Sequence, residues 1–344
     1  MQITSSWGRT VLLLIVFIAV PQVLHLILLS RLEGRQQKSQ QEPSFVDTEN
    51  VVPIYLSGHH IEEDRSVSSV IKLYLFSCMY FAHFVCNFLQ IESQFSELLR
   101  TLQRGGVLDI SGQYRVVPSL AAANSHINHA TLALPDIALV TQCSSQHLRE
   151  VPQLASRWQG PISVAVFSEI HDLGHTLWEI SKLRFCHLAV RQNVSFQLVS
   201  PLGAAIHRSP ILPPDADVSC EYDEDGSSGK NYAHSPVPYP VNLLRNVARR
   251  AAQTEFVFVM DVDMLPSAKL RERFLSFAAK AKLFKDSQRD DKTVYVVPAF
   301  EAKFGSHLPE DKKQLLQLSS EGSLRPFYFE LCWKCQVNFA TKLG

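Results

Sequence analysis

The sequence has no excess of charge of either sign. Lysine plus arginine and aspartate plus glutamate both number 33, so the formal net charge is zero at pH 7. Without a global basic field, nothing predicts a nucleic-acid partner, and other partners must be argued from local sites. Cysteine is also scarce, since seven residues in 344 are too few to build a disulfide scaffold. Hydrophobic residues make up 46% of the chain, which excludes disorder throughout and allows one large or two ordinary domains.

One apolar run is long enough to cross a membrane. Residues 11–29 are interrupted only by Pro21, Gln22 and His25. At about 1.5 Å per residue they would extend about 28 Å, close to the hydrocarbon thickness of a bilayer. No clear small-residue cleavage site follows, so we interpret the run as a transmembrane signal-anchor after a cytoplasmic tail of residues 1–10. Basic residues stand on both sides of it, so the flanking charges do not assign its orientation.

Residues 30–99 are expected to form a stem, which is polar and flexible at its start. A second apolar stretch, residues 70–91, lies within this stem and carries Lys72, His83 and Asn87. These interruptions favour a packed or aberrant segment, and a second membrane span is the alternative.

From about residue 100 the sequence alternates between strand and helix patterns. Such alternation is typical of a doubly wound, mainly parallel sheet, the usual platform for nucleotides. We therefore predict an α/β domain over residues 100–344. The expected strands are 137–140, 162–167, 194–199, 256–260 and 293–300, and the expected helices are 146–158, 173–185 and 242–252.

Two carboxylates, Asp261 and Asp263, follow the apolar residues 256–260. The apolar run predicts a strand buried on both faces, as in a parallel sheet covered by helices. In an extended chain residues i and i+2 point to the same side, so both carboxylates are expected to face one point. That point would lie at the carboxyl end of the strand, where α/β sheets bind ligands, and carboxylate oxygens suit Mg²⁺ or Mn²⁺. The pattern predicts a metal–diphosphate site, and a solvated turn is the alternative.

The sequence after this strand predicts a turn and a helix. Pro266 is expected to stop the strand, and Ser267 to cap the helix. The apolar face of this helix would consist of Leu270, Phe274, Phe277, Ala278 and Ala281.

Other candidate site residues lie elsewhere in the domain. Arg245 and Arg249, four residues apart on the predicted helix 242–252, form a basic stripe that would bind a diphosphate or is a solvated face. Glu301 ends the predicted strand 293–300 and would hold an acceptor hydroxyl or is a surface residue. Asn193 begins an Asn-Val-Ser sequon for N-glycosylation.

Cys332 and Cys335 form a Cys-x-x-Cys pair near the end of the chain. Zinc would need two more ligands at suitable spacing, and none follow. A redox pair would need a strand-to-helix context that this stretch lacks. A disulfide, with each other or with another cysteine, is the plainer interpretation.

Six sequence blocks between about residues 100 and 336 resemble the β-1,4-glucuronyltransferase family, glycosyltransferase family 49. The same domain resembles the C-terminal domain of the LARGE xylosyl- and glucuronyltransferases. The blocks occur in order at residues 105–115, 158–161, 239–249, 256–267, 296–301 and 325–336.

This resemblance implies a GT-A-like fold in a single-pass type II Golgi membrane protein with a luminal catalytic domain. It implies inverting transfer of glucuronate from UDP-glucuronate to β-xylose on O-mannosyl glycans of glycoproteins of the α-dystroglycan type. Asp261 and Asp263 match the family's Asp-x-Asp motif, which binds Mn²⁺ (or Mg²⁺). The expected partners are a UDP-sugar donor, a glycan acceptor on a glycoprotein, the Golgi membrane and other glycosyltransferases, with no nucleic acid.

The chain departs from the family at two places. The family continues well beyond Cys335, with part of the acceptor site and a metal-binding histidine, so the domain is expected to be C-terminally incomplete. The apolar stretch 70–91 has no counterpart that we identify in the family. A catalytically inactive, Golgi-resident binding protein of the same family is therefore one alternative. The other is a haloacid-dehalogenase-like phosphatase, in which Asp261 would be the nucleophile and Asp263 the general acid.

Overall fold

The structure, a computed structural model, describes residues 86–126, 134–202, 219–220, 237–285 and 293–332. The expected cytoplasmic tail, the signal-anchor at 11–29 and residues 70–85 lie outside these ranges. Within the described part of the chain, no helix is both long and apolar enough to cross a membrane.

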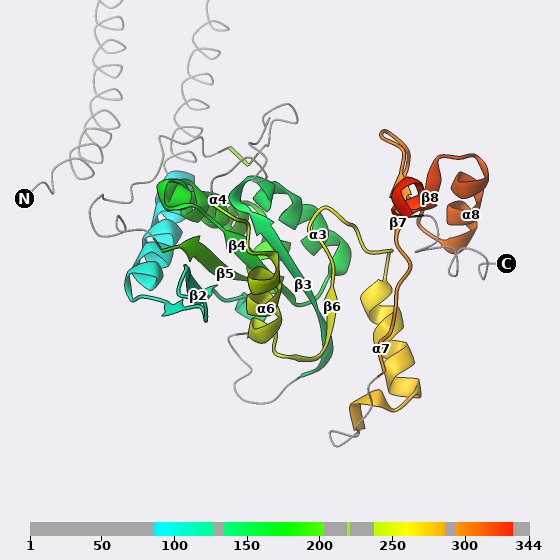
Figure 1. The fold of residues 1–344 in the computed structure, drawn as a ribbon, viewed down its shortest axis with the longest axis horizontal. Helices are drawn as coiled ribbons and strands as arrows, with labels where there is room; N and C mark the ends of the chain where they lie inside the picture. The colour runs from blue at the N-terminus through cyan, green and yellow to red at the C-terminus, as the bar shows by residue number, and fades with distance from the viewer. Residues whose placement is uncertain (1–85, 127–133, 203–218, 221–236, 286–292, 333–344) are drawn as a thin grey trace, which may run out of the picture. The chain divides into compact units, whose positions relative to one another are not determined.

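A six-stranded sheet in the order β1-β2-β5-β4-β3-β6 forms the centre of the domain (Figure 1). Strands β5, β4, β3 and β6 run parallel to one another, while β2 is antiparallel to β5 and β1 is antiparallel to β2. The predicted α/β class with a mainly parallel sheet is therefore confirmed. The strands are β1 (Val107–Leu108), β2 (Tyr114–Ala121), β3 (Leu134–Ser144), β4 (Ile162–Phe167), β5 (Val194–Pro201) and β6 (Thr254–Val259).

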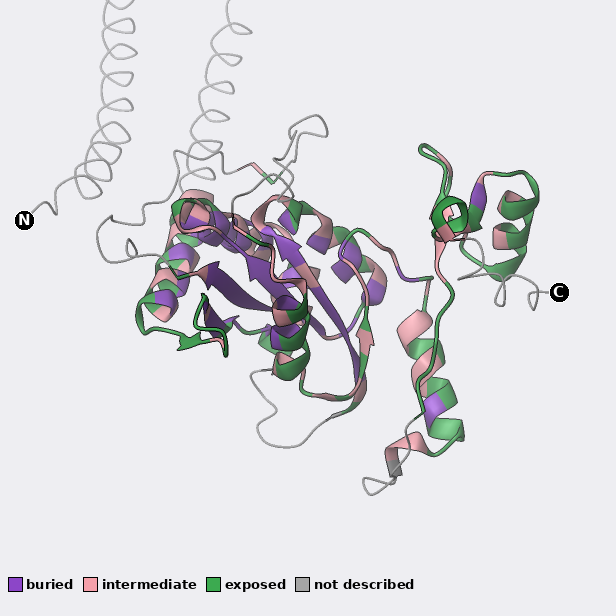
Figure 2. Cartoon of the chain, in the orientation of Figure 1, coloured by how far each residue is buried: buried purple, intermediate pink, exposed green. Residues whose placement is uncertain are grey.

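Helices cover both faces of this sheet, and the buried residues between helices and strands form the core (Figure 2). One face packs against α3 (Val151–Trp158), α4 (Leu173–Cys186) and α5 (Leu188–Asn193), and the other against α6 (Val241–Ala251). The predicted helices 173–185 and 242–252 thus appear as α4 and α6. The 3-10 helices among the described residues are Asn124–His126, Ser145–Glu150, Ile170–Asp172 and Leu283–Lys285.

Residues 86–103 are helical and belong to the packed domain, although residues up to 99 were expected in the stem. Ile91 is completely buried, and Phe95 is 3% exposed. The rings of Phe88 and Phe95 lie 5.9 and 6.1 Å from that of Trp178 in α4. The end of the apolar stretch 70–91 is therefore apolar because it packs against α4.

The prediction that strand 256–260 is buried on both faces is wrong. Strand β6 occupies the end of the sheet, and its residues alternate between intermediate and exposed. Val257 and Val259 are 38% and 47% exposed, whereas Phe256 and Phe258 pack against the core. A strand at the edge of the described sheet needs only one apolar face, and the uniform apolar run concealed this position.

The predicted helix 146–158 is divided in two. Residues Ser145–Glu150 form a 3-10 helix, and α3 begins only at Val151. Pro152 lies in the first turn of α3, where its missing N–H costs nothing because first-turn amides lack helical acceptors.

Helix α7 (Leu270–Lys280) follows Asp261 and Asp263 in the chain, but the Ser267 side chain does not cap it. Lys269 precedes the helix in a left-handed conformation with φ of 58°, and the Leu270 amide donates to the Ser267 carbonyl oxygen. The backbone of Ser267, rather than its hydroxyl, therefore takes part in the turn. Phe277, expected on the buried face, is 47% exposed.

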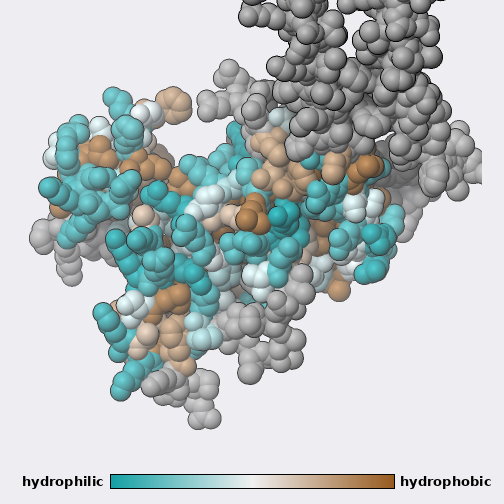
Figure 3. Space-filling model, turned by 180° about the vertical axis from the view of Figure 1, so that it is seen from behind, coloured by the Kyte–Doolittle hydropathy of each residue, from teal (hydrophilic) through white to brown (hydrophobic). Residues whose placement is uncertain are grey.

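The predicted strand 293–300 is wrong over most of its length. Only Phe300–Ala302 (β7) forms a strand, pairing antiparallel with Leu324–Pro326 (β8) beside helix α8 (Lys312–Ser320). Val294 and Val296 are 81% and 62% exposed, and apolar atoms lie at the surface around α7 and this segment (Figure 3). The β-branched residues here favour an extended chain, but a strand also requires a hydrogen-bonded neighbour, which this segment lacks among the described residues.

Candidate functional site

The two predicted metal ligands flank a tight turn at the carboxyl end of β6. The parallel ladder ends where the Met260 amide donates to the Val140 carbonyl oxygen at 3.1 Å. The Met264 amide then donates to the Asp261 carbonyl oxygen at 3.2 Å, which closes a turn. We call residues 261–264 the acidic turn. The chain here is not extended, so the expectation that Asp261 and Asp263 share one side of a strand is wrong.

Val262 anchors the acidic turn to the hydrophobic core. Its side chain is 8% exposed and belongs to the main hydrophobic core. Asp261 is half-buried and Asp263 is exposed. Alternation of polar and apolar residues thus places an apolar anchor in the core and a carboxylate on either side of it.

Arg245, predicted to bind a diphosphate, instead pairs with Asp261 in this structure. Its Nη2 donates to Asp261 Oδ1 at 2.7 Å, and the two side chains are 43% and 46% exposed. A solvent-exposed ion pair of this kind contributes about 0.2–1 kcal/mol. The guanidinium can therefore exchange its partner at little cost. Arg245 therefore lies beside the acidic turn.

Arg249 is also exposed on α6, but it lies one helical turn further on. Four residues correspond to about 6 Å along a helix. Since Arg245 is the residue that contacts Asp261, Arg249 is displaced from the acidic turn by about this distance along α6.

The carboxyl end of β3 brings further polar groups to the same edge of the sheet. The Tyr239 hydroxyl, just before α6, donates to Oε1 of Gln142, and the Tyr239 ring packs against Phe167 at 5.4 Å. Ser144 Oγ is buried and has no hydrogen-bond partner among the described residues. Sequence reasoning missed Gln142 and Ser144, although the change from apolar to polar residues at the end of this strand is a visible signal.

Glu301, the candidate for holding an acceptor, is engaged elsewhere. It lies on β7, and its carboxylate accepts from Arg325 Nε at 2.6 Å. Arg325 also donates to Glu330, and these two hydrogen bonds raise the pKa of the guanidinium. A role for Glu301 as a base would require Arg325 to release it.

The acidic turn offers hard oxygen ligands that fit Mg²⁺ or Mn²⁺. In the described part of the chain, no three histidine, cysteine or acidic side chains converge. Divalent cations that act on nucleotides usually have one or two protein carboxylates, and phosphate oxygens and water complete the shell. Asp261 and Asp263 match this donor set.

The sequon at Asn193 spans the last residue of α5 and the first two residues of β5. Asn193 is half-buried, Val194 is completely buried, and Ser195 Oγ accepts from the Ala123 amide at 3.2 Å. Since the folded domain holds this sequon in place, sugar attachment there would precede the folding of β5.

The cysteines are partly oxidised. Cys186, at the end of α4, forms a disulfide with Cys220. Cys332 is also disulfide-bonded, which confirms the interpretation of the Cys-x-x-Cys stretch as part of a disulfide rather than a zinc site. The Cys186–Cys220 pairing was not predicted, because residues distant in sequence give no local signal for it.

Comparison with known proteins decides the family. The sequence model of a family described as glycosyl-transferase for dystroglycan matches residues 136–341. The chain belongs to this glycosyltransferase family. The match includes the acidic turn, α6 and the carboxyl ends of β3 and β4, and it leaves the phosphatase alternative without support.

Relatives from this family are similar over different shares of the chain. β-1,4-Glucuronyltransferase 1 of Danio rerio is 30% identical over 360 residues, covering 97% of this chain and 73% of the relative. The human protein of that name is 34% identical over 252 residues, covering 70% of this chain and 57% of the relative. Xylosyl- and glucuronyltransferase LARGE2 of Mus musculus is 31% identical over 195 residues, covering 56% of this chain and 23% of the relative. The chain therefore spans a little over half the length of several mammalian relatives.

Proposed function

We propose that this family member is a glucuronyltransferase with a GT-A-like fold. It would transfer glucuronate from UDP-glucuronate to β-xylose on O-mannosyl glycans of glycoproteins of the α-dystroglycan type. The observation that carries the proposal is the acidic turn at the carboxyl end of β6, with Arg245 held against it. The names of the relatives support glucuronate as the transferred sugar.

The donor would lie along the edge formed by β3 and β6. Asp261 and Asp263 would hold a divalent cation, Mn²⁺ or Mg²⁺, which when bound neutralises the charge developing on the departing diphosphate. Arg245 would release Asp261 and turn toward the diphosphate, because a guanidinium binds phosphate oxygens through two parallel hydrogen bonds. Ser144 and Gln142, at the carboxyl end of β3, would contact the nucleotide, and the buried Ser144 hydroxyl would there gain a hydrogen bond that it lacks among the described residues.

The reaction is a single displacement with inversion. The acceptor hydroxyl oxygen attacks C1 of glucuronate, the bond from C1 to the UDP oxygen breaks, and the acceptor proton passes to a base. We propose Glu301 for this role, which requires Arg325 to release its carboxylate. Replacing Glu301 by Gln would then abolish transfer but leave the binding of UDP unchanged.

An assay of the full 344-residue chain tests the proposal. We expect Mn²⁺-dependent transfer from UDP-glucuronate to a β-xyloside, and a loss of at least about a hundredfold in Asp261→Asn, since these carboxylates support the leaving group. Glu255→Gln is the matched control, because Glu255 is exposed on β6 but precedes the site. Equal activity of Asp261→Asn and Glu255→Gln would overturn the proposal.

The inactive binding protein of the same family gives a different result in the same experiment. It would bind UDP-glucuronate and Mn²⁺ in a calorimeter, and the affinity would fall in Asp261→Asn, without any transfer. That outcome would support the proposed donor site and reject the proposed transferase activity.

We also propose the location expected from the sequence, a Golgi membrane with the domain in the lumen and other glycosyltransferases as neighbours. The Cys186–Cys220 disulfide supports this, because stable disulfides form in oxidising compartments. A glycan at Asn193 gives the test: peptide N-glycosidase would shift the wild-type protein on a gel but not Asn193→Gln. A cytosol-facing domain would show no shift.

A further inference from the structure

Two arginines hold the chain that leaves the acidic turn. We call residues 265–269, which join the acidic turn to α7, the connecting segment. Arg157, in the last turn of α3, donates from Nε to the Pro266 carbonyl oxygen at 3.1 Å. Pro266 is buried, so this hydrogen bond satisfies the carbonyl oxygen of a residue that is largely removed from water.

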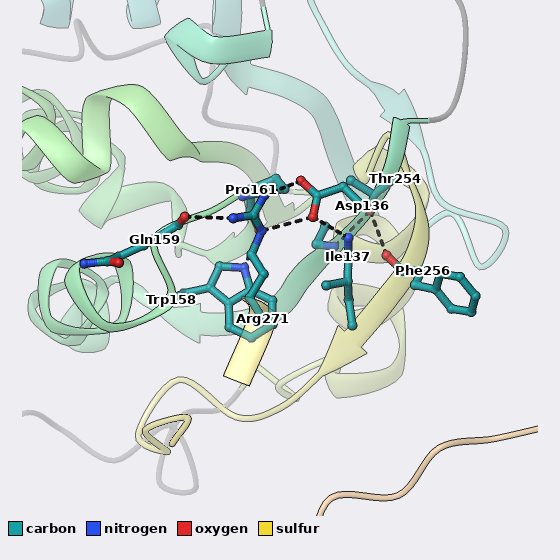
Figure 4. A network of polar contacts seen from close by, with 9 residues as sticks. Asp136, Ile137, Trp158, Gln159, Pro161, Thr254, Phe256 and Arg271 are labelled. Atoms are coloured by element: carbon teal, nitrogen blue, oxygen red, sulfur yellow. Dashed lines mark hydrogen bonds and ion pairs between the residues drawn. The ribbon is translucent and has the colours of Figure 1, made fainter. Parts of the chain in front are cut away.

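Arg271 fixes the other end of the connecting segment (Figure 4). Its Nε and Nη2 donate to the two oxygens of Asp136 at 3.0 and 2.6 Å, and Nη1 donates to the Gln159 carbonyl oxygen at 3.1 Å. The Arg271 and Asp136 side chains are only 23% and 17% exposed. A two-pronged, partly buried pair of this kind is directional and stronger than an exposed one.

The turn after α3 is shaped to receive the Arg271 side chain. Gln159 adopts a left-handed conformation with φ of 53°, and Trp158 Nε1 donates to the Pro161 carbonyl oxygen at 3.0 Å. A Cβ atom added to Gly160 would lie 2.3 Å from Arg271 Nε. Glycine is therefore required at this position for the arginine to pass. Residues 158–161 are one of the sequence blocks shared with the family, and this contact gives them a physical role.

The same turn also supports β6 directly. The ring of Trp158 stacks on that of Phe258 at 5.8 Å, one residue before β6 ends at Val259. The acidic turn is thus held on one side by β6 and on the other by the connecting segment.

We infer that Arg157 and Arg271, the second seated by residues 158–161, are positioning residues for Asp261 and Asp263. They act by fixing the connecting segment, and so set the orientation of the two carboxylates toward a divalent cation and diphosphate. This inference rests on the proposed function. Groups that orient metal ligands from outside typically change metal affinity by about 10–100-fold when they are altered.

Three variants of the full chain test this. Gly160→Ala leaves every charge in place and displaces Arg271, and Arg271→Lys keeps the charge but cannot reach both Asp136 oxygens and the Gln159 carbonyl oxygen together. The control is Arg184→Gln, because Arg184 also donates to a carbonyl oxygen, that of Ala122, but on α4.

The measurement is the Mn²⁺ dissociation constant of the UDP-loaded chain, read from the paramagnetic resonance signal of free Mn²⁺ below the melting temperature of each variant. We expect about a tenfold weaker constant in Gly160→Ala, a smaller loss in Arg271→Lys, and no change in Arg184→Gln. Amide hydrogen exchange should rise over residues 260–268 in the first two variants and not in the control. A merely structural role would lower the melting temperatures of Gly160→Ala and Arg271→Lys and leave the Mn²⁺ constant of the folded protein unchanged.

The outcomes separate the two proposals. If the wild-type chain binds Mn²⁺ with UDP, and Gly160→Ala and Arg271→Lys bind it equally well, the positioning role is rejected and the proposed function stands. If the wild-type chain binds no Mn²⁺ in the presence of UDP, the proposed function fails, and this inference fails with it.

Discussion

Removing the disulfide between Cys186 and Cys220 should cost this domain a large share of its stability. The bond joins the end of α4 to the segment between β5 and α6, across a sequence separation of 34 residues. The loop so closed contains α5 and β5, one of the central strands.

The expected magnitude follows from the length of this loop. In the chain-entropy treatment, a crosslink over 34 residues restricts the unfolded chain by about 4 kcal/mol at 25 °C. Measured values for native disulfides are typically about 2–4 kcal/mol, so we expect a loss in that range. For a domain of this size, that lowers the melting temperature by about 10 °C.

The assay compares urea and thermal unfolding of the double variant Cys186→Ala/Cys220→Ala with the wild type, followed by circular dichroism. Cys86→Ala is the matched control, because Cys86 is an exposed free thiol and its removal breaks no bond. Wild-type protein should lose at least this much stability in dithiothreitol, which also reduces the disulfide at Cys332. Any further effect of dithiothreitol on the double variant would report on the second disulfide, at Cys332.

Equal unfolding free energies of the double variant and Cys86→Ala would refute the reasoning. They would mean that the unfolded chain is already restricted in this region, so the crosslink removes no freedom from it.

Three other predictions concern single side chains. Ser144→Ala should raise the unfolding free energy of the ligand-free protein by about 1 kcal/mol, because it removes a buried hydroxyl without a partner among the described residues. The same variant should bind UDP more weakly in a calorimeter. An unchanged UDP affinity would show that Ser144 does not belong to the site. Burial lowers the pKa of His187 below its usual 6.5, so stability is complete above that pH and is lost as pH falls through the lower folded-state value. Urea midpoints between pH 5 and 7 should therefore slope in the wild type and flatten in His187→Gln, and parallel slopes would contradict this. Burial raises the pKa of the Cys143 thiol to about 12, so iodoacetamide at pH 8 should label Cys86 and not Cys143 in the folded protein, as peptide mass mapping would show.

Much of the fold followed from local pattern. Residues 162–167 were predicted as a strand and form β4 with the same bounds, and all six are buried. Helix α4 extends the prediction by one residue, and α6, predicted over residues 242–252, buries Leu244, Val247 and Ala248. The short continuous apolar run of β4 and the helical spacing of apolar residues in α6 are local signals, and the fold buries the residues that they mark.

The predictions that failed depended on partners distant in the sequence. Residues 256–260 are apolar throughout, yet β6 lies at the end of the described sheet, and only its Phe256 and Phe258 side is packed. Residues 293–299 have strand composition, but no neighbouring strand pairs with them in the described part of the chain. A strand is completed by hydrogen bonds to another segment, and composition alone cannot supply that segment.

For the site, the sequence alone determined that two carboxylates follow a β-strand and that a helix carrying Arg245 and Arg249 precedes this strand. Which groups meet was decided only by tertiary structure: Asp261 with Arg245 across α6 and β6, and Asp136 with Arg271 across the turn at Gly160. The physical reason is the sequence separation of the contacts involved. Strand and helix patterns arise from contacts within a few residues. The acidic turn instead depends on Val262, which packs in the core, and on Arg157 of α3 and Arg271 of α7, which only the folded chain brings to the connecting segment.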